Sequence, residues 1–321
     1  MYLIATDEAG YGPNLGPLAV SATLWQLSEG IQPEEMAVRL APEVVPQVSQ
    51  EGLAVGDSKK LYQSHRWFSL ERSVLAFLDA LGKLPLPLDS EGLFAACCFP
   101  ENLRERRSSP GFEGKISLPH EALLEECLQW GEKLRRKRAE SGIDLLGIQS
   151  DLVFPQRWNA GVKRCGSKGV FLSQTTLQLV AGFWRQILQL EKNAQKEFSI
   201  LVLCDKHGGR NRYLGTLMEH FDNLPFCIVT EGREKSEYIH YARHGTLSIR
   251  FVARGETHLA VALASMVSKY LREVAMEIFN RHWQRRIPTL RPTAGYPLDA
   301  RRFRQEIAPY VQDWQGVWRD K

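Results

Sequence analysis

The sequence predicts a mixed α/β fold, and two kinds of segment lead to this prediction. Residues 198–204, "FSILVLC", form a continuous apolar run with the length of a fully covered central strand. Residues 172–190 and 257–283 have the length and apolar spacing of long helices. Strand-like and helix-like segments alternate along the chain, which is typical of helices layered on a sheet.

The other elements can be placed in chain order. Residues 1–25 read as a strand, a glycine-rich turn and a second strand. Apolar residues at helical spacing predict a helix over 66–81. The further expected elements are a helix over 119–140, a strand over 143–154 and a strand over 248–253. The segment 82–118 is punctuated by prolines and reads as a long connection or an insertion, and neither it nor 206–247 receives a predicted role.

Composition places the chain among globular proteins. Of its 321 residues, 44% are hydrophobic and 24% are charged, as in an ordinary globular protein of one large domain or two smaller ones. The apolar stretches fall short of the roughly 18 residues that a membrane span needs. The first residues lack a basic region and a cleavage site, and the six cysteines lack zinc-ligand spacing. We therefore expect a cytoplasmic protein with reduced thiols and no membrane partner.

The net charge of +4 is a weak sign of a polyanionic partner, and the distribution of basic residues is more informative. Arginines interleave with Trp283 in residues 281–291 and with Phe303 in residues 301–304, as in many nucleic-acid grooves. A third basic run, "KLRRKR" at 133–138, has two interpretations. It is either part of such a groove or an ordinary solvated helix face.

Acidic residues follow two of the predicted strands. Asp7 and Glu8 come directly after the first strand, and Asp205 comes directly after residues 198–204. Ligand sites of α/β sheets form at such strand ends, so the two aspartates meet if their strands are neighbours. Glu8 shares their side only if the backbone leaves strand geometry there, which Gly10 permits. The alternative is that each aspartate caps a local turn.

A cluster of carboxylates needs cations to offset its repulsion. Divalent Mg²⁺ or Mn²⁺ is the natural partner of an all-oxygen ligand set. Two such ions about 4 Å apart support in-line attack on a phosphodiester. The acids therefore suggest a metal-dependent phosphodiester hydrolase.

Four blocks of sequence, spread over nearly the whole chain, resemble the type 2 ribonuclease H (ribonuclease HII) family. The blocks are "DEAGYGPNLGPLAV" at 7–20, "GDSKKL" at 56–61, "ALASMVSKYLRE" at 262–273 and "AGYPL" at 294–298. The resemblance implies a ribonuclease H-like fold, in which three antiparallel strands are followed by parallel ones and helices cover both sides of this mixed sheet. It also implies a catalytic domain over 1–256, with an insertion near 82–118. A helical C-terminal extension over 257–321 would complete the site and clamp the substrate.

The activity that the resemblance implies is metal-dependent endonucleolytic hydrolysis of the RNA strand of RNA–DNA hybrids, or of embedded ribonucleotides. Two Mg²⁺ or Mn²⁺ ions would be held by the residues that match the family's four acids, namely Asp7, Glu8, Asp205 and Glu273. The family senses the ribose 2′-hydroxyl with a Gly-Arg-Gly turn, which reads Gly10, Tyr11 and Gly12 here. Tyr296 matches a tyrosine that stacks on the sugar.

Further substrate contacts are expected from Lys59, Lys60, Ser265 and Lys269. The spacing of Ser265, Lys269 and Glu273 places them on one side of a helix, although Lys269 and Glu273 could equally form an ordinary surface pair. One of the two lysines at 59 and 60 could instead pair with Asp57, which we interpret as structural.

Three further interpretations rest on the sequence alone. His207 is either a proton shuttle or part of a glycine-rich phosphate-binding loop. Glu256 is interpreted as a helix-start acid that complements the helix dipole. The alternatives for function are the same fold and metals acting on another nucleic-acid structure, or a non-catalytic nucleic-acid-binding module.

Overall fold

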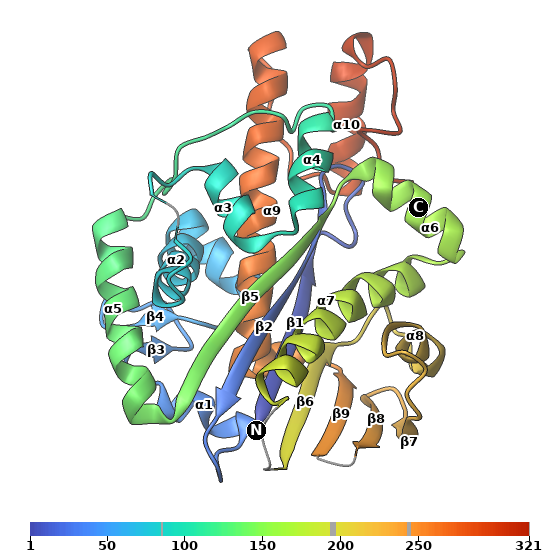
Figure 1. Ribbon diagram of the computed structural model, residues 1–321. Coiled ribbons are helices and arrows are strands. Elements are labelled where there is room, and N and C mark those ends of the chain that lie inside the picture. The colour runs from blue at the N-terminus through green and yellow to red at the C-terminus, as the bar shows by residue number, and fades with distance from the viewer. Residues whose placement is uncertain (85, 193–196, 243–244, 321) are drawn as a thin grey trace.

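The computed structural model describes residues 1–84, 86–192, 197–242 and 245–320, with the side chains of all of these except residues 63–66. A seven-stranded sheet forms its centre, with the strand order β5-β2-β1-β6-β9-β8-β7 (Figure 1). The strands are β1 (Tyr2–Ala9), β2 (Leu18–Leu27), β5 (Ile143–Val153), β6 (Phe198–Asp205), β7 (Cys227–Glu231), β8 (Lys235–Ala242) and β9 (Gly245–Val252). A separate pair, β3 (Val44–Val45) and β4 (Leu53–Ala54), is parallel.

The sheet is mixed in the way that the sequence predicts. Strands β1, β2 and β5 pair antiparallel, and β6 and β9 then run parallel to β1. Strands β8 and β7 extend the sheet antiparallel beyond β9, and with α8 they lie in the segment 206–247. The predicted fold class, a mixed central sheet flanked by helices, is confirmed.

Helices cover both faces because the central strands are apolar on both sides. Leu3 and Ala5 of β1 pack into one core with α2, α5 and α9, whereas Tyr2 and Ile4 pack into a second core with α7. Figure 1 shows α7 on one face of the sheet and α9 on the other. The long helices are α2 (Ser58–Ala80), α5 (Leu124–Ser141), α7 (Lys168–Leu190) and α9 (Leu259–Arg286).

Shorter elements complete the two layers. They are η1 (Pro33–Glu35), α1 (Met36–Arg39), α3 (Ser90–Cys97), α4 (Pro100–Ser108), α6 (Pro155–Cys165), α8 (Leu214–His220), η2 (Gly255–Thr257), α10 (Pro297–Ile307) and η3 (Ala308–Tyr310). Helices α3 and α4 lie in the segment 82–118 and pack against β5, where Asn102 donates a hydrogen bond to Asp151 at 2.8 Å. This segment is therefore a cover for the edge of the sheet. Among the described residues, the helices all lack the length and apolar character that crossing a membrane would require.

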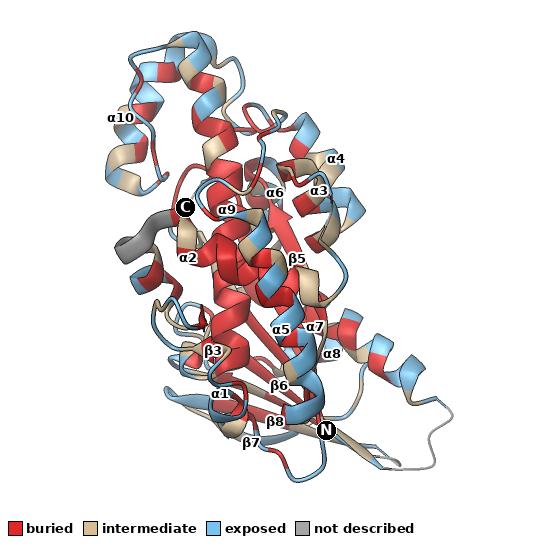
Figure 2. Ribbon diagram, turned by 90° about the vertical axis from the view of Figure 1, so that its left-hand side faces the viewer, coloured by how far each residue is buried: buried red, intermediate tan, exposed pale blue. Residues whose placement is uncertain are grey.

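Helix α9 is the main support of the sheet's second face. It packs against β1 and β2, and it is buried along most of its length (Figure 2). Asp57 caps the neighbouring helix α2 by accepting hydrogen bonds from the amides of Lys59 and Lys60, as the structural interpretation of this residue predicts. This cap therefore fixes the N-terminal end of α2, which packs against α9.

Candidate active site

A cavity of about 520 Å³ opens at the ends of β1 and β6, and five carboxylates line it. Three of them, Asp7, Glu8 and Asp205, belong to the predicted set. The other two are Glu256, which lies in η2 directly before α9, and Asp57, which caps α2. The structure thus brings together acids that are up to 249 positions apart, since the cluster runs from Asp7 to Glu256.

The parallel register of β1 and β6 explains why the aspartates meet. Thr6 is opposite Cys204 in the last matched pair of the two strands, so Asp7 and Asp205 are the next residues on each side. Strand β1 does not end at Asp7, however, because its pairing with β2 continues through Glu8 to Ala9. The expectation that the strand stops at the acids is corrected. The break in geometry comes at Gly10, whose φ is +87°.

Hydrogen bonds from α9 and its approach hold both aspartates. The Ser265 hydroxyl hydrogen-bonds to the Asp7 carboxylate, and Ser58 Oγ lies 2.9 Å from Ser265 Oγ. Ser268 donates to the backbone carbonyl of Asp7 at 3.0 Å. On β6, the Gly255 amide donates to Asp205 Oδ1 at 3.0 Å. The carboxylates are therefore fixed by groups around them.

The cluster carries more negative charge than its surroundings neutralise. Burial, together with the charges of Asp205 and Glu256, raises the pKa of Asp7 to about 7, against the lowering effect of the Ser265 hydrogen bond. Burial and the charges of Asp7 and Asp205 likewise hold the pKa of Glu8 well above its ordinary value. Burial is also the largest cause of the raised pKa of Asp205, and Glu256 adds to it. Bound cations would relieve this repulsion.

The donor set fits hard divalent ions, because every acidic side chain in the cavity offers carboxylate oxygens. Within the part of the chain that the structure describes, no group of three or more His, Cys, Asp and Glu side chains is placed so that it could hold a metal ion as it stands. Asp7, Glu8, Asp205 and Glu256 share the cavity, and Lys59 lowers the pKa of Glu8 and of Asp205.

Glu273 lies outside this cavity, and the expectation that it joins the acids is corrected. Its carboxylate accepts a hydrogen bond from the Tyr62 hydroxyl at 2.9 Å and pairs with Lys269 Nζ at 2.6 Å. Arg272 Nη1 lies 3.5 Å from it. Glu273 is 7% exposed, and these contacts compensate its charge inside the protein. The Lys269–Glu273 pair exists, but it is buried rather than exposed to solvent.

Glu256 is an acid whose position in the cavity the sequence did not predict. It was interpreted as a helix-start acid, yet it lines the cavity and raises the pKa of Asp7 and of Asp205. The sequence feature that could have indicated this place is the position of Glu256 before α9, because a residue that precedes this helix lies at the same edge of the sheet as Asp205. The motif "ALASMVSKYLRE" begins only at residue 262 and does not include it.

The predicted substrate-binding lysines separate into two groups. Lys59 and Lys269 line the cavity, and Lys269 Nζ also lies 4.3 Å from the centre of the Tyr62 ring. Lys60 points to a neighbouring hollow of about 720 Å³ and pairs with Asp57 Oδ2 at 3.8 Å. Ser265 lines the cavity, as described above.

The glycine turn borders the cavity through Gly10, Tyr11 and Gly12. A Cβ at Gly10 would lie 2.4 Å from Arg272 Nε, so only glycine fits against this buried guanidinium. Tyr11 leans toward α6, with its ring centre 6.1 Å from that of Trp158. Burial, with the charge of Glu8, raises the pKa of Tyr11. The tyrosine is therefore partly a packing residue.

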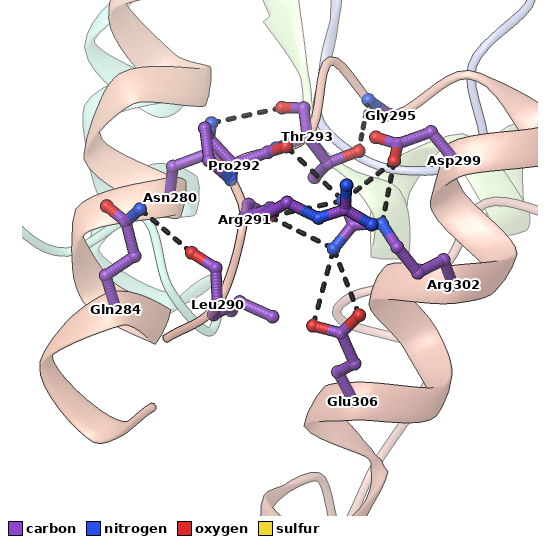
Figure 3. Close-up of polar contacts among 10 residues, drawn as sticks. All are labelled: Asn280, Gln284, Leu290, Arg291, Pro292, Thr293, Gly295, Asp299, Arg302 and Glu306. Atoms are coloured by element: carbon purple, nitrogen blue, oxygen red, sulfur yellow. Dashed lines mark hydrogen bonds and ion pairs between the residues drawn. The ribbon is translucent and has the colours of Figure 1, made fainter. Parts of the chain in front are cut away.

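Tyr296 is 51% exposed and lines the cavity at the start of α10. The loop before it is held by polar contacts, which Figure 3 shows. Thr293 and Asn280 exchange hydrogen bonds of 2.9 and 3.0 Å, and Arg302 bonds to Asp299 at 2.7 Å. The Asn14 amide donates to the Gly295 carbonyl at 2.9 Å, which joins this loop to the glycine turn.

His207 does not reach the cavity. It is 2% exposed, its Nδ1 lies 2.9 Å from Ser173 Oγ, and its ring packs against Tyr213 and Phe251. Burial lowers its pKa to about 3, with the charge of Arg210 contributing, so the imidazole is neutral at physiological pH. The structure therefore favours a packing role over a proton shuttle.

The basic run 133–138 lies on α5 and is largely neutralised by nearby acids. Its ion pairs are Arg135–Asp79, Arg136–Glu132, Lys137–Glu43 and Arg138–Asp144. This pattern fits the interpretation as a solvated helix face. Arg281, Arg285 and Arg286 lie instead on α9, and Arg301, Arg302 and Arg304 lie on α10, which Tyr296 precedes.

No protein-family model matches the chain, and no curated protein sequence matches it either. Among solved structures, the Q54A mutant of Bst-RNase HIII is similar with a TM-score of 0.44 and 14% identity over 99% of this chain. The chain spans 66% of the length of that protein. RNase HII from Archaeoglobus fulgidus, in its complex with PCNA, has a TM-score of 0.39 and 13% identity, over 99% of this chain and 93% of that one. Ribonuclease H2 from Pyrococcus horikoshii OT3 gives the same TM-score and identity, over 99% and 92%. These three TM-scores are all below 0.5, so any function has to be argued from the cavity itself.

Proposed function

We propose that this chain is a divalent-metal-dependent endonuclease that hydrolyses the RNA strand of RNA–DNA hybrids, or embedded ribonucleotides. One observation carries the proposal. Asp7, Glu8, Asp205 and Glu256 line one cavity together with two lysines, a glycine turn and an exposed tyrosine. Carboxylates suit metal ions, lysines suit phosphates, and the turn and the tyrosine suit a sugar.

In this proposal the metal ligands are Asp7, Glu8, Asp205 and Glu256. When bound, Mg²⁺ or Mn²⁺ ions would neutralise charge on the scissile phosphate and lower the pKa of the attacking water. The protein's part is to hold the carboxylates ready. Ser265 and the Glu8 amide, which donates to Asp7 Oδ1 at 2.8 Å, orient the Asp7 carboxylate, and the Gly255 amide orients Asp205.

The lysines of the cavity are proposed to bind phosphates on either side of the scissile bond. Lys59 comes from the N-terminal end of α2, and Lys269 comes from α9. Lys269 also pairs with Glu273, which fixes the direction of its side chain. Water attack breaks the bond between phosphorus and the 3′-oxygen, and the products carry 3′-hydroxyl and 5′-phosphate ends.

Selection of ribose is assigned to the two remaining parts of the rim. Gly12 is exposed, and a Cβ there would meet no atom within 4 Å, so a sugar can come close to its backbone. Tyr296 offers an exposed ring for stacking on the sugar. In this reading, residues 257–320 complete the site by supplying Ser265, Lys269 and Tyr296.

A second candidate keeps the cavity and changes the substrate. Tyr11 stands where the resembling family has an arginine, and its ring packs toward Trp158. The turn therefore offers no guanidinium of its own to a phosphate, which favours a nucleic-acid structure other than the plain hybrid.

The deciding assay uses three labelled duplexes: an RNA–DNA hybrid, a DNA duplex with one embedded ribonucleotide, and an all-DNA duplex. The purified chain is incubated with each in Mg²⁺ or Mn²⁺, beside the Asp7→Asn variant. We expect cleavage of the first two duplexes by the native chain alone. Cleavage of the all-DNA duplex would support the second candidate, and binding without any cleavage would support a non-catalytic module.

A further inference from the structure

The C-terminal segment lies along the glycine turn, about 300 positions away in the sequence. Trp318 forms an antiparallel bridge with Leu15, and the Arg319 amide donates to the Asn14 carbonyl at 2.8 Å. Asn14 Nδ2 returns a hydrogen bond to the Arg319 carbonyl at 3.0 Å. Figure 1 shows the C-terminal end beside α6, whose Asn159 donates to the Trp318 carbonyl at 2.8 Å. The turn and this segment form one unit.

The Arg319 side chain makes the closest link in this unit. Its Nη1 donates to the Gly10 carbonyl at 2.5 Å, and its Nη2 donates to the Tyr11 carbonyl at 3.2 Å. The guanidinium carbon lies 3.7 Å from the centre of the Trp158 ring. Arg319 is 1% exposed.

Stability alone gives little reason for a buried guanidinium here. Among the described residues, no carboxylate forms an ion pair with Arg319, and its Nε has no hydrogen-bond partner. Burial, with repulsion from Arg272, lowers the pKa of Arg319 well below its usual range. An uncompensated buried charge costs several kcal/mol. What this charge does for the chain is to fix two consecutive carbonyls of the glycine turn.

The planar geometry of the peptide bond determines the direction in which the amides of the turn point. In a planar trans peptide, the carbonyl of one residue and the amide of the next point in opposite directions. The carbonyls of Gly10 and Tyr11 face Arg319, so the amides of Tyr11 and Gly12 face away from it. Residues 10–12 line the cavity, whereas Arg319 does not, which places the guanidinium behind the turn.

We propose that Arg319 is a positioning residue that holds the carbonyls of Gly10 and Tyr11 behind the turn and thereby aims the amides of Tyr11 and Gly12 at the substrate's ribose. The proposal rests on the proposed function of the cavity for the identity of that substrate. It makes a buried guanidinium from the C-terminal segment a determinant of ribose selection, acting through the backbone without touching the sugar.

The test compares Arg319→Ala and Arg319→Lys with Arg304→Ala. Arg304 is the matched control, because its guanidinium lies 4.6 and 4.7 Å from the rings of Trp314 and Trp318 and so supports the same segment without contacting residues 10–12. The first measurement is amide hydrogen exchange at Asn14 and Leu15, which the Gly295 carbonyl protects. It requires no substrate and no activity.

We expect faster exchange at these two amides in Arg319→Ala, a smaller change in Arg319→Lys, and native exchange in Arg304→Ala. Millimolar guanidinium should slow the exchange again in Arg319→Ala by filling the space over Trp158. If Arg319→Ala does not fold, Arg319→Lys carries the same comparison. Native exchange in a folded Arg319 variant, or equal loosening in the Arg304 control, would overturn the proposal.

The second measurement is ribose discrimination, taken as the ratio of affinities for a duplex with one embedded ribonucleotide and for the all-DNA duplex, in the non-cleaving Asp7→Asn background. Loss of an aimed hydrogen-bond donor should reduce this ratio about tenfold in Arg319→Ala, with rescue by guanidinium and no change in Arg304→Ala. If the affinity ratio stays unchanged while amide exchange at Asn14 and Leu15 is altered, the role of Arg319 in ribose selection is refuted. A native chain that binds neither duplex would refute the proposed function, while the exchange result would still stand or fall by itself.

Discussion

The Gly255 amide donates a hydrogen bond to Asp205 Oδ1 at 3.0 Å, and this bond holds the residue before Glu256 at the end of β6. Gly255 is packed closely against Asp205, since a Cβ on it would lie 3.3 Å from the Asp205 Cα. The next residue, Glu256, is thereby delivered to the end of β6. Helix α9 starts three residues later at Leu259 and lines the cavity with Ser265 and Lys269.

Glu256→Gln should abolish metal-dependent activity and leave the fold intact. The amide is isosteric with the carboxylate but offers no charge to a divalent ion, so we expect at least a 100-fold loss of cleavage. The free energy of unfolding without metal should stay the same or rise, because one of the repelling charges is gone. A cleavage assay with Mn²⁺ and chemical unfolding measure the two effects, and calorimetric titration measures the binding of Mn²⁺.

Glu273→Gln is the matched control on the same helix, and the opposite pattern is expected. Lys269 loses its carboxylate partner inside the protein, which should lower the free energy of unfolding by on the order of 3 kcal/mol. Binding of Mn²⁺ should remain. If Glu273→Gln removed metal binding and Glu256→Gln did not, the assignment of the fourth acid would be reversed.

Much of this arrangement could be predicted from sequence, and the part that could not has a physical reason. Asp7 and Asp205 follow strands that could be recognised, and parallel pairing brings such ends together. Helical spacing places Ser265 and Glu273 on one side of α9, but eight residues of helix separate them by about 12 Å along the axis. Ser265 lies at the cavity and Glu273 lies beyond it. Periodicity gives a face of a helix, and it does not say where along that face the site ends.

The contributions of Arg319 and of the loop before Tyr296 were also beyond sequence reasoning. Both depend on contacts between segments far apart in the chain, such as the Asn14 amide with the Gly295 carbonyl. Several acceptors of these bonds, such as the Gly10, Tyr11 and Gly295 carbonyls, belong to the backbone, which any residue supplies, so no pattern of side chains predicts these contacts.

Divalent ions should stabilise the protein more at neutral pH than in acid. The pKa of Asp7 is about 7 in the folded chain against an ordinary value of 3.8, so between these values the folded state binds more protons than the unfolded state. The free energy of unfolding without metal therefore falls as pH rises through this window. Mg²⁺ competes with those protons, and its stabilising effect should grow over the same window, reaching about 2.7 kcal/mol at about 100 times Kd.

Thermal unfolding with millimolar Mg²⁺ and with chelator, at about pH 5 and about pH 8, checks this expectation. Asp7→Asn should flatten the pH dependence and reduce the response to Mg²⁺. An equal Mg²⁺ response at both pH values would show that the ion binds elsewhere.

Lys59→Ala and Lys60→Ala form a pair that separates a phosphate contact from a surface charge. Lys59 lines the cavity, whereas Lys60 pairs with Asp57 beside the neighbouring hollow. Loss of one phosphate contact should reduce the slope of log affinity against log salt by about 1. We expect this change in Lys59→Ala, and a native slope in Lys60→Ala, from fluorescence anisotropy with a labelled hybrid at several salt concentrations. Equal slopes in the two variants would remove Lys59 from the substrate-binding set.

Tyr296→Ala should weaken substrate binding without weakening the fold. The side chain is 51% exposed, so its loss should change the free energy of unfolding by less than about 0.5 kcal/mol. Stacking of an aromatic ring on a nucleotide contributes about 1–3 kcal/mol, and affinity for a ribonucleotide-containing duplex should fall accordingly. Tyr310→Ala is the control, because Tyr310 is similarly exposed at 53% and lies in η3 away from the cavity lining. Anisotropy in the Asp7→Asn background measures binding without turnover. The placement of Tyr296 against the sugar fails if both variants bind like the parent, or if Tyr310→Ala loses as much affinity as Tyr296→Ala.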